Sequence, residues 1–223
     1  QGENRKRKKE SNARDEVPMF WGQSEAMSRV RDSVDKVATT DANILITGEN
    51  GTGKEVLARE IHRRSLRRQS PMVSIDMGAI PESLFESELF GHKKGAFTDA
   101  HTDREGKFLV ANGGTLFLDE IGNLSQQSQQ KMLVALQNRS IVPLGSDEAV
   151  AVDIRLIAAT NRDLFKMVGE GYFRQDLLYR INTIHIELPP LRQRKEDILP
   201  LAEIFLTRYA NRYNKGELRF TEE

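Results

Sequence analysis

The sequence contains no cysteine, which excludes a disulfide framework, a thiolate metal site and a thiol nucleophile. No apolar run approaches the roughly 18 residues of a membrane span, and the first residues do not resemble a signal peptide. Lys and Arg total 33, as do Asp and Glu, so no overall positive field favours nucleic acid as the partner. These absences predict a soluble, cytoplasmic protein without membrane contact. The four histidines do not have the spacing of metal ligands and predict no metal site: His62, His92, His101 and His185.

The 223 residues suffice for one main core with appendages. Residues 1–16 are polar and include the basic run Arg5-Lys6-Arg7-Lys8-Lys9. A basic arm for nucleic acid and a solvated linker both explain this run, and the near absence of apolar residues favours the linker. The folded part is predicted to begin near Val17. Its first helix is expected to have Ser24 as N-cap and to pack through Met27, Val30, Val34 and Val37.

The most informative stretch is Gly48-Glu49-Asn50-Gly51-Thr52-Gly53-Lys54-Glu55, which lies between an apolar run and a helical pattern. Strand, glycine-rich loop and helix in this order predict a phosphate-binding loop rather than an ordinary tight turn that carries a lysine. The glycines let backbone N–H groups converge on phosphate oxygens, and Lys54 supplies a charge for the β and γ phosphates. Glu55 stands where most such loops carry Ser or Thr, so the usual hydroxyl ligand of Mg²⁺ is missing.

Short apolar runs predict five strands, at 43–47, 72–76, 115–118, 154–159 and 183–187, with helical segments between them. This alternation predicts an α/β fold with a mostly parallel sheet sandwiched by helices over residues 17–191. From Glu196 onward the sequence has an amphipathic helical pattern. One helix and a tail cannot make a domain, so residues 192–223 are expected to open a helical domain whose remainder lies outside this sequence.

Two carboxylates, Asp119 and Glu120, follow the third strand in the form of the second nucleotide-hydrolysis motif. A carboxylate at a strand tip can hold Mg²⁺, and its neighbour can polarise the water that attacks the γ phosphate. We assign Asp119 to the metal and Glu120 to the water. The alternative is a cluster that caps a helix, but Ile121-Gly122-Asn123 separates the pair from the helix expected at Ser125.

Other polar positions have two interpretations each. Thr160 and Asn161 either cap the fourth strand or report the γ phosphate. Asp76 is an ordinary strand-end carboxylate, or a partner of the catalytic glutamate if the sheet order brings the two together. Arg174 and Arg180 are surface charges, or they stabilise a neighbouring subunit's γ phosphate if the site lies at a subunit boundary. Residues 88–100 break a helical region with two glycines and are expected to present an aromatic side chain to a partner.

With these residues in place, the chain closely resembles the central AAA+ ATPase domain of bacterial enhancer-binding proteins, the NtrC-like activators of sigma-54 RNA polymerase. The similarity runs from about Val17 to the end of the sequence. It is carried by five motifs in the family's order: Gly48 to Glu55, Glu88-Leu89-Phe90-Gly91-His92, Gly113 to Glu120, Ala159-Thr160-Asn161-Arg162-Asp163-Leu164 and Pro189-Pro190-Leu191-Arg192. Glutamate after the loop lysine is usual in this family.

The resemblance implies a P-loop NTPase that binds ATP through residues 48–55 and Mg²⁺ through Asp119, with Glu120 activating water. Thr160 and Asn161 match the first sensor, and Asp76 matches the residue that restrains the catalytic glutamate. Arg174 and Arg180 match trans-acting arginine fingers. The active form would therefore be a ring, commonly a hexamer, with a dimer as the inactive state. The segment from residue 192 matches the start of the helical lid.

The resemblance also implies a partner. Gly95-Ala96-Phe97-Thr98-Asp99-Ala100 matches the loop that family members insert into sigma-54, and residues 140–152 match a second pore loop beside it. The family signature is Gly-Ala-Phe-Thr-Gly-Ala, so Asp99 replaces a glycine. A Cβ atom and a carboxylate at this hinge are expected to restrict the backbone and to add negative charge at the contact. Phe97 and Thr98 are intact.

The implied function is ATP-driven remodelling of sigma-54 RNA polymerase holoenzyme, so that promoter DNA can melt. The chain would be the central domain of a transcriptional regulator of the two-component type, with residues 1–16 as the linker from an upstream domain such as a receiver. A DNA-binding domain outside this sequence would hold enhancer DNA. One alternative is a nucleotide-gated oligomerisation module that has lost the sigma-54 contact through Asp99. An AAA+ remodeller of another client is a further alternative, against which the 95–100 loop argues.

Overall fold

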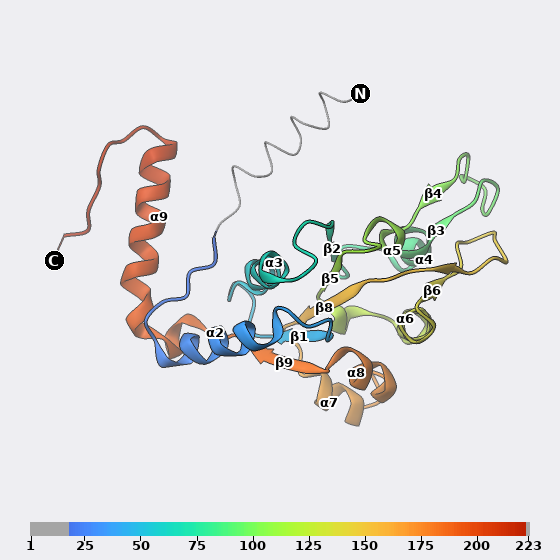
Figure 1. The fold of residues 1–223 in the computed structure, drawn as a ribbon, viewed down its shortest axis with the longest axis horizontal. Coiled ribbons are helices and arrows are strands. Elements are labelled where there is room, and N and C mark those ends of the chain that lie inside the picture. The colour runs from blue at the N-terminus through green and yellow to red at the C-terminus, as the bar shows by residue number, and fades with distance from the viewer. Residues whose placement is uncertain (1–17, 222–223) are drawn as a thin grey trace.

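A five-stranded parallel sheet forms the centre of the computed structural model, which describes residues 18–221 (Figure 1). The strand order is β2-β5-β8-β1-β9, and every neighbouring pair is parallel. The five strands are β1 (Ile44–Thr47), β2 (Met72–Asp76), β5 (Thr115–Asp119), β8 (Arg155–Thr160) and β9 (Ile184–Glu187). All five lie where the sequence predicts them, and the α/β fold is confirmed. The linker predicted at 1–16 lies outside the described residues.

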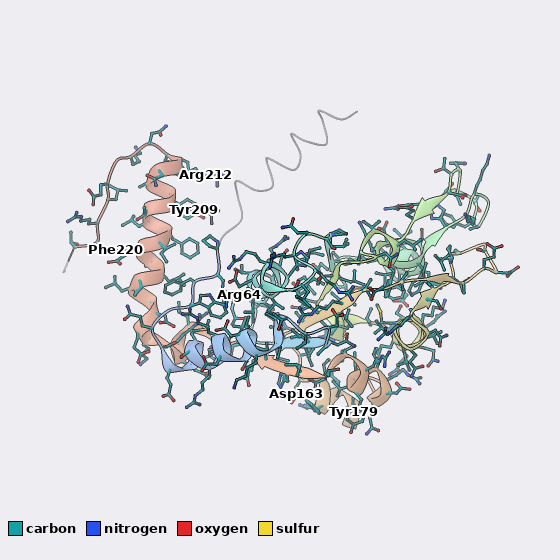
Figure 2. All side chains as sticks on the ribbon, in the orientation of Figure 1. Arg64, Asp163, Tyr179, Tyr209, Arg212 and Phe220 are labelled. Atoms are coloured by element: carbon teal, nitrogen blue, oxygen red, sulfur yellow. The ribbon has the colours of Figure 1, made fainter. Side chains whose placement is uncertain are left out.

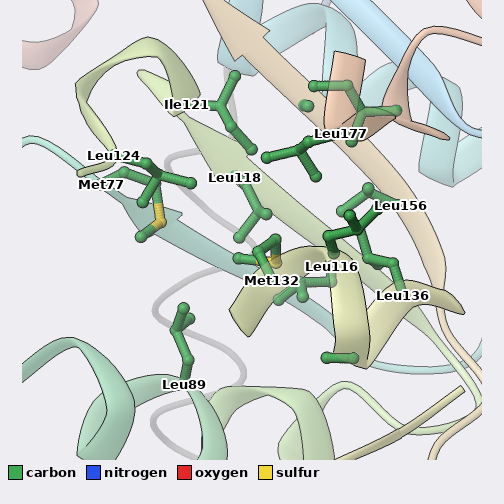
Figure 3. Close-up of a cluster of buried hydrophobic side chains, with 14 of the residues drawn as sticks. Met77, Leu89, Leu116, Leu118, Ile121, Leu124, Met132, Leu136, Leu156 and Leu177 are labelled. Atoms are coloured by element: carbon green, nitrogen blue, oxygen red, sulfur yellow. The ribbon is translucent and has the colours of Figure 1, made fainter. Parts of the chain in front are cut away.

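Alternation along the central strands divides the apolar side chains between two cores, because successive residues point to opposite faces of the sheet. Phe117 packs on one face and its neighbours Leu116 and Leu118 on the other. The core on the Phe117 face contains residues of α2 (Glu25–Val37) and α3 (Lys54–Arg64). The larger core, shown in part in Figure 3, contains residues of α4 (Phe85–Phe90), α5 (Lys107–Val110), α6 (Gln126–Asn138), α7 (Leu164–Gly169) and α8 (Gln175–Ile181).

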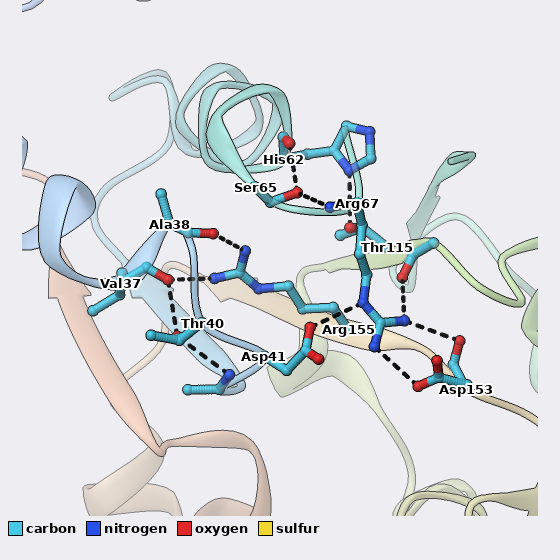
Figure 4. Close-up of polar contacts among 12 residues, drawn as sticks. Val37, Ala38, Thr40, Asp41, His62, Ser65, Arg67, Thr115, Asp153 and Arg155 are labelled. Carbon is cyan, nitrogen blue, oxygen red and sulfur yellow. Dashed lines mark hydrogen bonds and ion pairs between the residues drawn. The ribbon is translucent and has the colours of Figure 1, made fainter. Parts of the chain in front are cut away.

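Side-chain hydrogen bonds stabilise both ends of α2, the first described helix. Ser24 caps its start by accepting a hydrogen bond from the Met27 N–H, and the four apolar positions predicted for this helix are buried. At its other end the fully buried Arg155 donates to the carbonyls of Val37 (2.8 Å) and Ala38 (2.6 Å), as Figure 4 shows. The guanidinium thereby satisfies carbonyls that the helix itself leaves without partners.

Two short hairpins lie side by side at one end of the molecule (Figure 1). The first pairs β3 (Gly91–His92) with β4 (Arg104–Glu105), and the second pairs β6 (Ser140–Ile141) with β7 (Val150–Ala151). Leu144 of the second hairpin joins the first, because its N–H donates to the Gly91 carbonyl (3.0 Å) and its carbonyl accepts from the Lys93 N–H (2.9 Å). The segment predicted at 140–152 is therefore packed beside the 95–100 loop.

The segment after β9 forms η3 (Leu191–Gln193), η4 (Lys195–Asp197) and α9 (Ile198–Arg212), while η1 (Glu82–Leu84) and η2 (Ile121–Asn123) are short turns elsewhere. Helix α9, with Tyr209 and Arg212, stands clear of the sheet (Figure 2). The predicted helix is confirmed, yet most of its large apolar side chains are exposed: Ile198, Leu199, Ile204, Phe205 and Tyr209. That it opens a lid domain stays a prediction. Among the described helices, none combines the length and apolar character needed to cross a membrane.

Candidate nucleotide site

The phosphate loop connects β1 to α3 as the sequence predicts, with α3 beginning at Lys54. Gly51 (φ +81°) and Gly53 (φ +100°) have backbone conformations that residues with a Cβ atom rarely adopt. The loop therefore needs glycine at both positions to turn into the helix. Its N–H groups at the start of α3 carry the positive end of the helix dipole, which suits an anion.

Lys54 is buried, and its Nζ lies inside the loop that it follows. The ammonium group donates to the carbonyls of Gly48 (3.0 Å) and Glu49 (3.4 Å). It also lies 3.7 Å from Oε1 of Glu120, at the end of β5. Strand β5 thus brings the candidate catalytic carboxylate to the candidate phosphate-binding cation, as expected for strands whose carboxyl ends share one edge.

The carboxylates Asp76 and Asp119 are register partners on β2 and β5, so the sheet order does bring Asp76 beside the predicted catalytic pair. Burial raises the pKa of the Asp119 carboxyl, and the charges of Glu120 and Asp76 add to this, against a hydrogen bond from the Glu120 N–H and the charge of Lys54. Asp76 is exposed and accepts a hydrogen bond from the Gly78 N–H (2.8 Å), as an ordinary strand-end carboxylate would. Both interpretations of Asp76 fit this geometry.

Glu120 has a left-handed backbone conformation (φ +54°), which is uncommon for a residue other than glycine. Such strained positions cluster at functional sites, and here the strain lies between the strand and η2. The alternative in which the pair only caps a helix does not describe this arrangement, because α6 begins at Gln126 and its cap is Ser125.

A metal ion would rely on few protein ligands at this edge. In the described part of the chain, no group of three or more His, Cys, Asp or Glu side chains could hold a metal ion. Glu55, which stands where the usual hydroxyl would be, accepts a hydrogen bond from Arg59 (2.7 Å), one turn further along α3. Asp119 and the phosphate oxygens of a nucleotide together suit Mg²⁺, which prefers oxygen ligands and keeps several waters. The residues therefore fit a metal that arrives with its nucleotide.

Thr160 and Asn161 follow β8 and differ in their contacts. The buried Thr160 hydroxyl accepts a hydrogen bond from the Arg162 N–H (3.1 Å), which is a local turn contact. The Asn161 side chain donates to the Asn50 side-chain oxygen in the phosphate loop (2.9 Å). Its N–H also lies 3.5 Å from Oε2 of Glu120. Asn161 is thus at the candidate site, whereas the Thr160 hydroxyl serves the strand end.

Arg174, which precedes α8, and Arg180, within it, make hydrogen bonds away from the phosphate loop of their own chain. Arg174 forms a bidentate pair with Asp176 at 2.7 and 3.0 Å. Arg180 donates to the carbonyl of Leu136 near the end of α6 (2.8 Å). The structure therefore does not bring them to Lys54 and Glu120 within one chain, which is consistent with the prediction that they act on a neighbour and does not test it.

The 95–100 loop lies at the tip of the β3–β4 hairpin. Phe97 is 39% exposed, and its ring meets the buried His92 edge-to-face at 4.9 Å. Gly95 has a positive φ (+83°), whereas Asp99 is not among the described non-glycine residues with positive φ. Asp99 thus has an ordinary backbone conformation here, and the expectation that its Cβ atom restricts the loop relative to glycine stays a prediction.

Sequence reasoning missed two residues that contact the phosphate loop from the segment after β9. Arg194 is buried and its Nη2 donates to the Thr52 carbonyl at 3.4 Å. Arg192, noted only as part of a motif, forms a bidentate pair with Glu49 (2.8 Å for one of the two bonds). Their partners lie more than 140 residues away in sequence, so no local spacing could have indicated either contact.

Comparisons with known proteins agree with this geometry. The family model described as the Sigma-54 interaction domain matches residues 20–187, which include the phosphate loop, both carboxylates and both hairpins. Transcriptional regulatory protein ZraR of Klebsiella oxytoca is 52% identical over 202 residues, which cover 91% of this chain and 46% of ZraR. The chain thus spans less than half the length of this relative.

Two solved structures of NtrX from Brucella abortus are similar in fold. The complex with ADP has a TM-score of 0.84 at 33% identity, and covers 92% of this chain and 46% of the NtrX chain. The complex with ATP has a TM-score of 0.83 at 34% identity with the same coverage. In these relatives, domains of this fold belong to proteins that bind adenine nucleotides.

Proposed function

The chain belongs to the Sigma-54 interaction domain family, as a central AAA+ domain of the NtrC-like type, and from this premise we propose that it couples ATP hydrolysis to remodelling of sigma-54 RNA polymerase. One observation carries the proposal. A single sheet holds a phosphate loop facing Glu120 at its carboxyl edge, and the same domain extends two paired hairpins that expose Phe97. A nucleotide site and a partner-facing loop in one domain support such coupling.

The residues divide the hydrolytic work. The loop N–H groups and Lys54 would bind the phosphates, and Asp119 would hold Mg²⁺, which would supply charge neutralisation at the phosphates. Glu120 accepts a hydrogen bond from the attacking water and polarises it. Asn161 would respond to the γ phosphate, which its hydrogen bond to Asn50 of the phosphate loop supports.

Hydrolysis would require a ring, because Arg174 and Arg180 are directed away from the site of their own chain. In a ring, commonly a hexamer, the two guanidinium groups would exchange Asp176 and the Leu136 carbonyl for a neighbour's γ phosphate. A dimer would be the inactive form. Since the matched region covers only 46% of ZraR, we further infer that a regulatory domain and an enhancer-binding domain occupy the rest of the protein.

The test is capture of purified sigma-54 in the presence of Mg²⁺, ADP and aluminium fluoride, which mimics the transferred phosphate. Wild type is compared with Phe97→Ala, and Leu66→Ala serves as the control, since Leu66 is an exposed apolar residue in the turn after α3, outside both hairpins. We expect capture that depends on the nucleotide, is lost in Phe97→Ala, and remains in Leu66→Ala. Native gels or co-sedimentation give the bound fraction.

The alternative, an oligomerisation module that no longer contacts sigma-54, predicts the opposite result. Its support is the added charge of Asp99, since the backbone at this position is unstrained. A chain that assembles and hydrolyses ATP without capturing sigma-54 would overturn the remodelling proposal. Asp99→Gly would then show whether the charge is the cause, because restored capture would assign the loss to that one carboxylate.

A further inference from the structure

The segment that leads from β9 to α9 returns to the phosphate loop and contacts it through a buried arginine. Arg194 is 6% exposed, and its Nη2 lies 3.4 Å from the Thr52 carbonyl oxygen. Three residues later, Asp197 is fully buried and accepts hydrogen bonds from the Ser24 hydroxyl (2.6 Å) and the Gln23 N–H (2.6 Å). Asp197 therefore fixes the segment to the start of α2, which leaves Arg194 little freedom to move.

The burial of Arg194 is not explained by the hydrogen bonds that it makes. Its Nε is inaccessible and has no hydrogen-bond partner in the described part of the chain. Burial lowers the pKa of the guanidinium, and the charge of Asp197 only opposes this. A buried charge with an unpartnered donor costs stability, so such residues call for a reason other than folding. The hydrogen bond that the Arg194 side chain does make goes to a carbonyl in the candidate nucleotide site.

We infer that Arg194 is a positioning residue for the phosphate loop, which it holds in the orientation that binds a nucleoside di- or triphosphate. The peptide bond is planar and trans, so the Thr52 carbonyl and the Gly53 N–H point in opposite directions. A guanidinium that holds the carbonyl therefore turns the N–H away from itself. The neighbouring glycines give this peptide unit unusual rotational freedom, and a second contact is needed to select one orientation.

This inference rests on the proposed nucleotide site and adds a distinct consequence. The N–H groups of such loops bind the α and β phosphates, which ATP and ADP share. Loss of Arg194 should therefore weaken the binding of ATP and of ADP by the same factor. It should raise KM more than it lowers kcat, because Glu120 and Asp119 keep their places on β5.

Arg192 supplies a matched control in the same short segment. It also contacts the phosphate loop, through Glu49, but both side chains are more than half exposed, at 65% and 57%. Water screens an exposed pair, so its removal has a small effect. Moreover, the partner of Arg192 is a side chain and not a backbone carbonyl, so its loss leaves the orientation of the loop peptides unchanged.

The experiment measures equilibrium binding of fluorescent ATP and ADP analogues to the chain as it stands, together with kcat and KM. We expect Arg194→Gln to weaken the binding of both nucleotides about tenfold, which is the effect of one hydrogen bond from a charged group. The ratio of the two affinities should not change. Arg194→Lys keeps the positive charge but lacks the planar guanidinium, so it should bind both nucleotides about threefold more weakly. Arg192→Gln should stay within about twofold of wild type.

Thermal unfolding without nucleotide identifies any variant that fails to fold, and if Arg194→Gln does so, Arg194→Lys carries the test. Wild-type affinity in a folded variant would overturn the inference. So would a loss confined to ATP, because that would indicate a contact with the γ phosphate. A wild-type chain that binds neither nucleotide would refute the proposed function itself, which makes the two failures distinguishable.

Discussion

Nζ of Lys54 and Oε1 of Glu120 lie 3.7 Å apart, so the cation of the phosphate loop and the carboxylate after β5 face one another across the candidate site. The side chains are 7% and 20% exposed. Water therefore screens this pair less than a surface pair, and each charge helps to hold the other in place.

Glu120→Gln should reduce ATP hydrolysis at least about 100-fold, because the amide retains the shape of the side chain but cannot act as a general base. Nucleotide affinity should be retained, since Lys54 and the loop remain. The matched control is Glu55→Gln, which removes an exposed carboxylate paired with Arg59 and should leave turnover within about twofold. A folded Glu120→Gln chain with wild-type turnover in a phosphate-release assay would exclude Glu120 as the base.

Gly145→Ala should weaken sigma-54 capture at least about threefold while leaving ATP hydrolysis unchanged. A Cβ atom at Gly145 would lie 2.8 Å from Cβ of Ala96, so the two hairpins would have to separate. Gly171→Ala is the control, because Gly171 has a similar φ (+78° against +74°) and open space around the added atom. Equal capture by the two variants would show that hairpin contact does not support the partner surface.

Arg155→Met should lower the free energy of unfolding by about 1 to 3 kcal/mol, because the Ala38 carbonyl at the end of α2 loses its buried partner. Removal of a buried charge offsets part of this loss. The control is Arg31→Met on the exposed side of α2, which should change stability by less than about 0.5 kcal/mol. Urea unfolding monitored by circular dichroism gives both values, and an unchanged Arg155→Met midpoint would contradict the expectation.

Asp119→Asn should stabilise the chain at neutral pH. The folded state raises the pKa of Asp119, chiefly through burial, so it binds the proton more tightly than the unfolded state and ionisation of this carboxyl costs stability. The cost is fully present above the folded pKa and disappears as the pH falls below the ordinary value for aspartate. Urea unfolding at pH 7 should therefore give a higher free energy of unfolding for Asp119→Asn than for wild type, and this difference should shrink near pH 3.5. An advantage independent of pH would indicate another cause.

The fold was predictable largely because its three central strands, β1, β5 and β8, are buried on both faces. Such strands read as continuous apolar runs, and each was located within about one residue. Strand order was not predictable, since β1 pairs with β8 and β9 rather than with β2, its neighbour in sequence. The exposed apolar side of α9 also differs from its pattern, because a periodic sequence predicts a helix and does not state what covers it.

The candidate site was predictable where local sequence determines geometry, as in the phosphate loop and Asp119-Glu120. It was not predictable where the contact spans the chain. Arg194 and Thr52 are 142 residues apart, and Ser24 and Asp197 are 173 apart. The separate contacts of Thr160 and Asn161 also required coordinates, because adjacent residues at a strand end point in different directions.

The strand order also bears on how the protein is made. Strand β1 lies between β8 and β9, both of which are synthesised more than a hundred residues after it. At about 5 to 20 residues per second, a ribosome needs on the order of ten seconds to deliver the first of these partners. Until then Ile44-Leu45-Ile46 and the loop after them lack the two strands that flank β1 in the folded sheet. The phosphate loop is thus among the first parts of the domain to be translated and among the last to acquire its shape.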